Sequence, residues 1–307
     1  MNEEYKKMIG SHIAKEKTFF KTLSAPSTLP LIEGGCPIQI FTGSNRSWAL
    51  PQSDPQDVRE TRTWVEEKGV TLFIHSIYLI NLSRCGSDFS KARDRLIHDL
   101  VLGPQLGAKG VVVHVGKALQ MGQPQAILNM YNNLVGLLDH IDPSCPLLVE
   151  TPAGQGTEIL VSLDSFKKFY ARFTPQQMEK IKVCIDTCHV WAAGHEPLEY
   201  LEGWTQTFPG SSNSEGVGAD RTPSGVRYRS VEDGQGAKQG FARSSVTRAR
   251  RVLDARSLAL VHYNDSKTPK GSRRDRHEVP GEGHIGKEKM DRIVEWCTAA
   301  EVPMVVE

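Results

Sequence analysis

A short apolar stretch ends in two side chains that could bind a metal ion or act as an acid–base pair. Residues 183–189 read VCIDTCH, and the first three form a buried-strand run. Asp186 and His189 follow where that strand should end. In a parallel α/β protein this point is the carboxyl edge of the sheet, where functional sites are built. A carboxylate and an imidazole at this edge suit metal binding or proton transfer.

The same pattern recurs at the ends of nearly all the other apolar runs. A single histidine at a strand end is usually a hydrogen-bonded structural residue, and a single acid there is often a helix cap. The complete set does not fit that interpretation, because four carboxylates on one edge would repel each other without cations. The candidate ligands are His75, His114, Glu150, Asp186, His189, His262, Asp275, His277 and Glu307. Mixed imidazole and carboxylate ligation favours zinc, with manganese or iron as alternatives.

Spacing suggests which of these side chains could act together. Asp275 and His277 are two residues apart, so in an extended segment both point the same way and could share one metal ion. Asp186 and His189 straddle the exit of a strand, so we expect them to point in different directions and to serve different metals.

Eight short apolar, β-branched runs supply the strand ends, most of them about 30 to 40 residues apart, which is the period of one β/α unit. The expected strands are 8–13, 38–42, 71–75, 110–115, 146–150, 183–187, 258–264 and 302–307. Helical patterns fill the gaps. The sequence therefore predicts an α/β fold, a (β/α)₈ TIM barrel that spans residues 1–307 as one domain. An open doubly wound sheet is the alternative, but no GxGxxG follows the first strand.

Two irregularities interrupt this repeat. Residues 203–245 are rich in Gly and Ser and poor in core residues, which predicts a long flexible insertion between the sixth and seventh units. Its basic residues could touch a polyanion, but a solvated insertion is the simpler interpretation. The last residue, Glu307, lies on the eighth expected strand, so we expect no eighth helix in this chain.

Composition limits the classes of partner. The net charge is +1, so nucleic-acid binding would need a local basic face. No apolar run approaches the roughly 18 residues of a membrane span, and the N-terminus lacks a signal-peptide core. Six scattered cysteines are typical of reduced thiols, so we expect an intracellular protein that is not secreted and has no membrane partner. Cys184 and Cys188 lack the spacing of a zinc-binding pair, and we interpret them as small buried side chains.

Several stretches resemble signatures of the endonuclease IV family of apurinic/apyrimidinic (AP) endonucleases. They are IHSIYLINLSR, VVHVGK, LLVETPAGQGTEI, VCIDTCHVWAAGHE, VHYNDSKTPKGSRRDRHEVPGEGHIG and PMVVE. GSHI and QIFTGSNRSW fit the family's first two strands, so the resemblance spans the chain apart from the insertion. The family implies a barrel that binds three zinc ions in a DNA-binding crater, with manganese possible at one site.

The resemblance also implies how the ligands are shared. His75, His114 and Glu150 would hold the first zinc ion. Glu150 would bridge to a second, which Asp186, His262 and Glu307 complete. His189, Asp275 and His277 would hold the third. This division agrees with the spacing argument, and the catalytic residues would be Glu150 and Glu307.

Further residues are expected to contact DNA. They are His12, Arg46, Trp48, Tyr78, Asn81, Lys267, Arg273 and Arg276. Side chains in the loops after the second and third strands could enter the base stack and help eject an abasic nucleotide. For Trp48, a buried loop anchor is an equal alternative. The basic residues near the DRH motif lie between metal ligands, which favours contact with the DNA backbone over a solvated loop.

The resemblance implies a zinc-dependent hydrolase that cuts DNA 5′ to an abasic site, leaving a 3′-hydroxyl and a 5′-deoxyribose phosphate. Trimming of blocked 3′ ends in base excision repair would be a second activity. The expected partner is double-stranded DNA with abasic or 3′-blocked lesions, bound by a monomer. Two alternatives stay open. One is a metal-dependent sugar isomerase or epimerase of similar fold, which metal content would distinguish. The other is an abasic-DNA-binding scaffold, marked by binding without cleavage.

Overall fold

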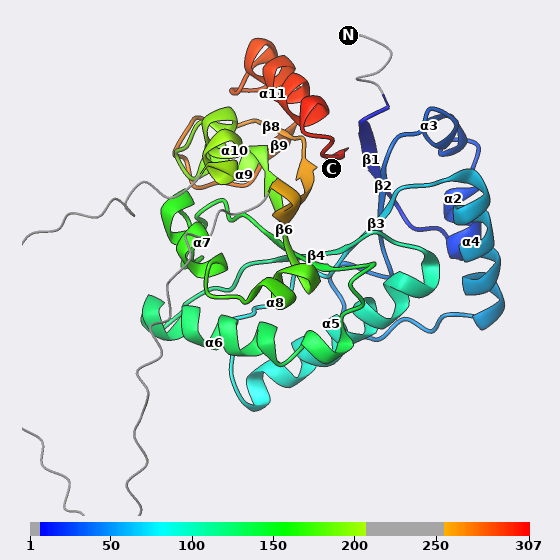
Figure 1. Cartoon of the computed structure of the whole chain (residues 1–307), viewed down its shortest axis with the longest axis horizontal. Helices are drawn as coiled ribbons and strands as arrows, with labels where there is room; N and C mark the ends of the chain where they lie inside the picture. The colour runs from blue at the N-terminus through cyan, green and yellow to red at the C-terminus, as the bar shows by residue number, and fades with distance from the viewer. Residues whose placement is uncertain (1–6, 207–254) are drawn as a thin grey trace, which may run out of the picture. The chain divides into compact units, whose positions relative to one another are not determined.

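A computed structural model describes residues 7–206 and 255–307, and eight parallel strands in them close into a barrel (Figure 1). The barrel strands are β1 (Ile9–Ile13), β2 (Ile38–Phe41), β3 (Leu72–His75), β4 (Val111–His114), β5 (Leu147–Glu150), β6 (Ile181–Asp186), β7 (Leu258–His262) and β10 (Met304–Val306). The final strand, β10, lies between β1 and β7 and closes the ring. All eight expected strands are confirmed to within a few residues, and closure excludes the open sheet.

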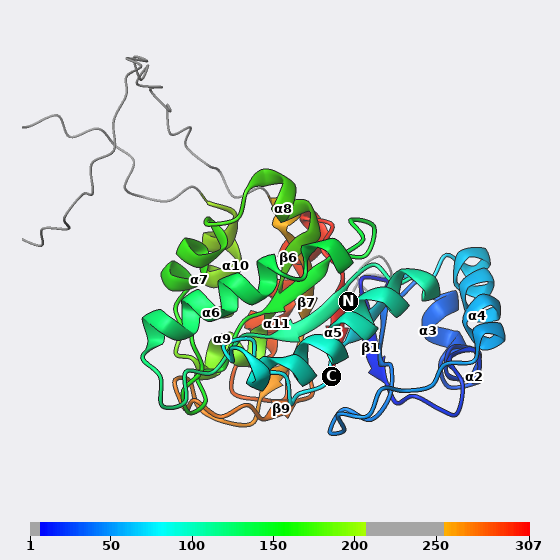
Figure 2. The ribbon, with the colours of Figure 1, turned by 90° about the horizontal axis from the view of Figure 1, so that it is seen from below.

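Helices follow most of the barrel strands and lie on the outside of the ring (Figures 1 and 2). They are α2 (Phe19–Leu23), α3 (Leu29–Glu33), α4 (Pro55–Lys68), α5 (Ser87–Leu106), α6 (Gln123–Val135), η1 (Leu138–His140), α7 (Leu163–Tyr170), α8 (Pro175–Lys180), α9 (Thr187–Ala192), α10 (Pro197–Thr205), η2 (Ala255–Ser257) and α11 (Lys287–Ala299). A small hairpin, β8 (Asp265–Ser266) and β9 (His277–Glu278), follows β7. Within this part of the chain, no helix has the length and apolar character that a membrane crossing needs.

An apolar layer inside the barrel explains where the candidate ligands point. Its buried members are Phe73, Val112, Leu148, Cys184, Leu260 and Val305, one from each of six strands. Two residues further along the same strands come His75, His114, Glu150, Asp186, His262 and Glu307. Because side chains alternate between the two faces of a strand, residues two apart share a face. The layer therefore forms a floor beneath these candidate ligands, at the carboxyl end of the barrel.

The Gly/Ser-rich segment begins later than the sequence indicated. We expected the insertion to start at residue 203, but Gly203 and Trp204 belong to α10, where they form hydrogen bonds with α7 and η2. The Gly203 carbonyl accepts a hydrogen bond from Lys167 Nζ at 2.6 Å, and Trp204 Nε1 donates to Ser257 Oγ at 3.0 Å. Residues 207–245 of the expected insertion lie outside the described residues. The described chain ends at Glu307, so it does not test the expectation about an eighth helix.

Candidate metal centre

The strand-end ligands gather around the carboxylate of Glu150, which is fully buried. Its Oε2 atom lies 3.2 Å from His75 Nε2 and 3.0 Å from His114 Nε2. Its Oε1 atom lies 3.1 Å from His262 Nδ1 and 3.3 Å from His189 Nδ1. Four imidazoles from different parts of the chain thus surround one carboxylate at the mouth of the barrel.

The contacts of the ring nitrogens show that two of these histidines are suited to bind a cation. His75 Nδ1 lies 2.6 Å from the Ser76 carbonyl, while its Nε2 faces Glu150. His262 Nε2 lies 2.9 Å from Gln39 Oε1, while its Nδ1 faces Glu150. Both nitrogens of each ring therefore face acceptors, although a neutral imidazole has only one N–H. Either the ring is protonated or a cation lies between nitrogen and carboxylate, so the donor set fits a metal bound through His75 Nε2 and His262 Nδ1.

Two buried amides hold the carboxylates of this cluster, and the sequence analysis missed both. Gln39 Nε2 donates to Glu307 Oε1 at 2.7 Å. Asn264 Oδ1 accepts from the Glu307 backbone N–H at 2.9 Å, and its Nδ2 donates to Asp186 Oδ2 at 2.8 Å. The available signal was an amide residue inside each of two otherwise apolar strand runs. Such orienting groups are typical of metal sites.

A second group of ligands lies beside the first and is built mainly from the loop after β7. Asp275 Oδ2 lies 3.2 Å from His189 Nε2, and Asp275 Oδ1 lies 2.9 Å from His277 Nε2. Both histidine nitrogens are buried, and each lies at ion-pair distance from an Asp275 oxygen. His189 Nδ1 donates to the Thr151 carbonyl at 2.8 Å, which leaves Nε2 for a cation. Two buried ring nitrogens that converge on one carboxylate fit a second metal position.

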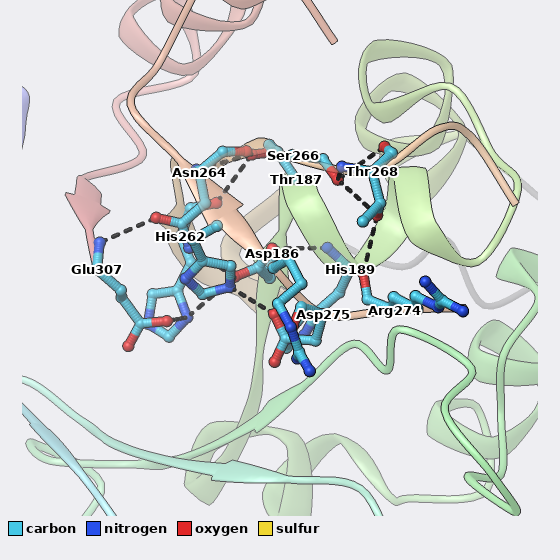
Figure 3. Close-up of polar contacts among 12 residues, drawn as sticks. Asp186, Thr187, His189, His262, Asn264, Ser266, Thr268, Arg274, Asp275 and Glu307 are labelled. Carbon is cyan, nitrogen blue, oxygen red and sulfur yellow. Dashed lines mark hydrogen bonds and ion pairs between the residues drawn. The ribbon is translucent and has the colours of Figure 1, made fainter. Parts of the chain in front are cut away.

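Asp186 lies between the two groups, as Figure 3 shows. Its Oδ1 atom accepts from the His189 backbone N–H at 2.8 Å and caps the start of α9. Its Oδ2 atom lies 3.8 Å from His262 Nδ1 and 3.6 Å from His277 Nε2. Ligand atoms of His189, Asp275 and His277 lie within 4.8 Å of one another, as do those of His75, Glu150, His262 and Glu307. Ligand atoms of Glu150, Asp186 and His189 also lie within 4.8 Å of one another, so the two groups are continuous through these residues.

Burial and neighbouring charges shift the titration of this centre. Burial alone would raise the pKa of Glu150, but His114 and His262 outweigh it and hold that pKa well below its ordinary value. Burial alone would lower the pKa of His189, but Asp186 and Asp275 outweigh it and raise that pKa well above its ordinary value. Carboxylates and imidazoles thus stabilise each other's charged forms. Because a bound cation must displace protons from these rings, metal affinity should weaken in acid.

Cys188 lies close to the ligands without being a good ligand itself. Its Sγ atom is within 4.8 Å of ligand atoms of Asp186 and His277. Burial raises the pKa of this thiol to about 12, and metal binding requires the thiolate. Its complete burial agrees with the interpretation of Cys188 as a small core side chain.

The residues expected to contact DNA are mostly exposed and follow the carboxyl ends of strands. Trp48 is 39% exposed and Tyr78 is 43% exposed, so Trp48 is not a buried anchor. The Tyr78 ring lies 5.3 Å from the His75 ring, at the edge of the first ligand group. Exposed basic side chains are Arg46 after β2, and Lys267, Arg273 and Arg276 around the loop between β8 and β9.

Two of the residues expected to contact DNA also make hydrogen bonds or ion pairs within the protein. The His12 side chain is only 11% exposed, and its Nδ1 atom lies 3.4 Å from Glu307 Oε1. Asn81 Oδ1 accepts from the backbone N–H groups of Ser83 and Lys117, and Asn81 Nδ2 donates to the Lys117 carbonyl. These positions suit His12 to hold Glu307 and Asn81 to hold the backbone of Lys117.

One buried carboxylate orders the segment that follows the second ligand group. Asp265 accepts five backbone N–H bonds of 2.7 to 3.2 Å, from Ser266, Gly281, Gly283, Ile285 and Gly286. A Cβ atom at Gly283 would collide with this carboxylate, so only glycine fits there. Ser266 in turn pairs with His277 across the β8–β9 hairpin. The sequence analysis missed Asp265, because its partners are backbone groups that no motif reveals.

A cavity of about 190 Å³ opens beside both ligand groups. Its lining includes Tyr78, His114, His189, Asp275, His277 and Glu307, together with Lys117, Gln155 and Glu158. Carboxylates and imidazoles next to an open cavity could hold cations and still leave room for a ligand.

Comparison with known proteins shows which family this chain belongs to. A family model described as a xylose isomerase-like TIM barrel matches residues 37–296, which defines the class of the chain. A protein from Streptomyces coelicolor named "Probable endonuclease 4" is 30% identical, covering 88% of this chain and 79% of that protein. Within its class, the chain belongs to the endonuclease IV family, which confirms the resemblance seen in its sequence.

Solved structures share the barrel. The crystal structure of endonuclease IV from Thermus thermophilus matches with a TM-score of 0.69 and 24% identity, covering 98% of this chain and 91% of that chain. A D-tagatose 3-epimerase-like protein matches with a TM-score of 0.61 and 11% identity, covering 97% and 89% of the two chains. Fold similarity therefore extends to proteins named for sugar chemistry, and function must be argued from the site.

Asp265→Asn should destabilise the loop of the second ligand group. An amide NH₂ would face backbone N–H donors, so we expect a loss of about 3 kcal/mol in the free energy of unfolding. Any metal ion that His189, Asp275 and His277 bind should also be lost. Urea unfolding and metal analysis of purified protein would measure both.

Asp291→Asn is the matched control, because the Asp291 side chain is 46% exposed and pairs with Lys287 one turn away on the same helix. It should cost less than about 1 kcal/mol. If the two variants behaved alike, Asp265 would not be the organiser of this loop.

Proposed function

We propose that this chain is a zinc-dependent AP endonuclease that hydrolyses the DNA backbone 5′ to an abasic site. The products would be a 3′-hydroxyl and a 5′-deoxyribose phosphate, and blocked 3′ ends would be trimmed at the same site in base excision repair. The carrying observation is the group of imidazoles around buried Glu150 at the carboxyl mouth of a barrel of the endonuclease IV family.

Three zinc ions would be held by nine side chains, with Glu150 shared between two of the ions. By resemblance to the family, the proposed sets are His75, His114 and Glu150; Glu150, Asp186, His262 and Glu307; and His189, Asp275 and His277. Ligand atoms of the third set lie within 4.8 Å of one another. When bound, such ions activate water at neutral pH and neutralise charge on a phosphate and its leaving oxygen. Support for this assignment comes from the buried nitrogens of His189 and His277 that converge on Asp275, and from the rings of His75 and His262, which have acceptors at both nitrogens.

The protein's own residues would arrange the substrate over this centre. Exposed Trp48 and Tyr78 stand on neighbouring loops, which the Tyr78 N–H ties together by a 3.2 Å bond to the Asn45 carbonyl. Aromatic and cationic side chains on such a rim could enter the base stack, and the abasic nucleotide would then fill the cavity. The exposed side chains of Lys267, Arg273 and Arg276 would contact the DNA backbone.

Sugar isomerases and epimerases use similar barrels, and a binding scaffold without turnover is a further alternative. Five imidazoles among nine candidate ligands are more than a one- or two-metal carboxylate site needs. Together with membership of the endonuclease IV family, this favours the nuclease.

The direct test is incubation with duplex DNA that contains one tetrahydrofuran abasic analogue. We expect a single cut 5′ to the analogue, no cut in the undamaged duplex, loss of cutting after chelation and recovery with zinc. Gel analysis of end-labelled strands would locate the cut. Binding of abasic duplex without any cut in the zinc-loaded protein would instead identify a binding scaffold.

Glu150→Gln should abolish most cleavage while leaving much of the DNA affinity. Glutamine keeps the volume but removes the charge that holds cations and imidazoles together. We expect cleavage to fall at least about a thousandfold, the scale for losing a main electrostatic element. Affinity for abasic duplex should fall much less, because the rim loops and phosphate contacts remain. Single-turnover cleavage, bound zinc and DNA affinity would be measured together.

Glu66→Gln provides the same chemical change on the exposed surface of α4, where Glu66 pairs with Arg62. It should leave cleavage and metal content unchanged. Near-normal cleavage and full zinc content in Glu150→Gln would contradict the bridging role.

A further inference from the structure

One wall of the cavity carries a cation that the proposed metal ligands do not explain. Lys117 follows β4 and lines the cavity together with His114, His189 and Asp275. Among the described residues that line this cavity, it is the sole lysine or arginine. The other charged or titratable lining groups are carboxylates, imidazoles and the Tyr78 phenol.

The backbone of Lys117 is fixed on two sides. Asn81 Oδ1 accepts from the Lys117 N–H at 2.8 Å, and Asn81 Nδ2 donates to the Lys117 carbonyl at 3.1 Å. On the other side, Lys117 forms an antiparallel bridge with Glu158. The side chain therefore starts from a defined position on the cavity wall, unlike that of a typical exposed lysine.

The Lys117 ammonium group is held in a defined direction, but its hydrogen-bonding capacity is not filled. Lys117 Nζ lies 3.4 Å from Glu158 Oε1, while Glu158 Oε2 accepts from the Gln155 N–H at 2.9 Å. Glu158 is 9% exposed, so its carboxylate is a fixed partner that holds the lysine side chain in place. An ammonium has three donors, and the 3.4 Å contact is longer than a direct charge-assisted hydrogen bond. The Lys117 side chain is 46% exposed and can still donate to a ligand in the cavity.

We infer that Lys117 forms an anion subsite for a backbone phosphate next to the one that is cut. This inference rests on the proposed function, because a DNA strand over the ligand groups would carry neighbouring phosphates along the cavity wall. A phosphate oxygen suits a lysine, since the ammonium acts as a point charge without a preferred plane. Asn81 and Glu158 are positioning residues for this contact.

Lys117→Gln tests this subsite in the zinc-loaded protein. The probe is a nicked duplex ending in a 5′-phosphorylated tetrahydrofuran, the product of the proposed cut, which offers the same phosphates and no bond to cleave. Fluorescence anisotropy at several salt concentrations would give affinity and its salt dependence. We expect about tenfold weaker binding, the scale for a hydrogen bond to a charged group. The slope of log affinity against log salt should become shallower by about one.

Two further variants separate this role from general charge effects. Lys117→Arg should keep most of the affinity and the wild-type slope. Lys68→Gln makes the same charge change at the exposed C-terminal end of α4 and should change neither quantity. In single-turnover cleavage of the intact abasic duplex, Lys117→Gln should raise the half-saturating protein concentration and leave the maximal rate within about threefold, because the contact is made equally before and during reaction.

The possible results distinguish the subsite from the proposed function. Wild-type affinity and slope in Lys117→Gln would overturn the subsite even if abasic DNA is cut. Weaker binding with an unchanged slope would also overturn it, because the lost contact would then be to uncharged sugar. If the wild type never cuts abasic DNA, the proposed function fails, and a shallower slope in Lys117→Gln would still establish the phosphate contact.

Discussion

Burial of the Glu150 carboxylate is the constraint on which the rest of the centre depends. A carboxylate that is fully removed from water is costly unless positive charge or hydrogen bonds compensate for it. Here four imidazoles from β3, β4, β7 and α9 supply that compensation, and protons or cations must supply the charge. The same requirement explains why buried amides, Gln39 and Asn264, fix the neighbouring carboxylates. Every strand that contributes is therefore tied to one charge at the barrel mouth.

The barrel places its ligands around Glu150 through the regular alternation of side chains along its strands. The apolar layer seals the interior, and the ligand two residues further along each strand faces the same way at the open end. Rigid strands place the first ligand group, whereas a loop must place Asp275 and His277. That loop gains its order from backbone hydrogen bonds of Gly271 and Arg273 to α9, and Asp265 fixes the segment that follows it. The strands of the sheet thus fix the first ligand group, whereas local loop contacts fix the second.

The sequence predicted the strands, their closure and the place of the ligands, because alternation and β/α spacing are local patterns. His75 and His262 could be assigned to one edge from the sequence alone, since both end apolar runs. Gln39 and Asp265 could not, because their role depends on partners far away in the chain. His12 and Asn81 were expected to contact DNA, but the fold turns His12 toward Glu307 and uses Asn81 to hold Lys117. Such predictions are limited because these side-chain contacts form only when the chain folds.

The central claim is that the ligand groups around Glu150 and Asp275 hold three cations. Anomalous diffraction from zinc-loaded crystals, measured on both sides of the zinc absorption edge, tests it most directly. The account predicts three zinc peaks per chain, each about 2.0 to 2.3 Å from ring nitrogens or carboxylate oxygens of the proposed sets, with Glu150 contacting two of them. A single peak, or peaks that Glu150 does not contact, would contradict it.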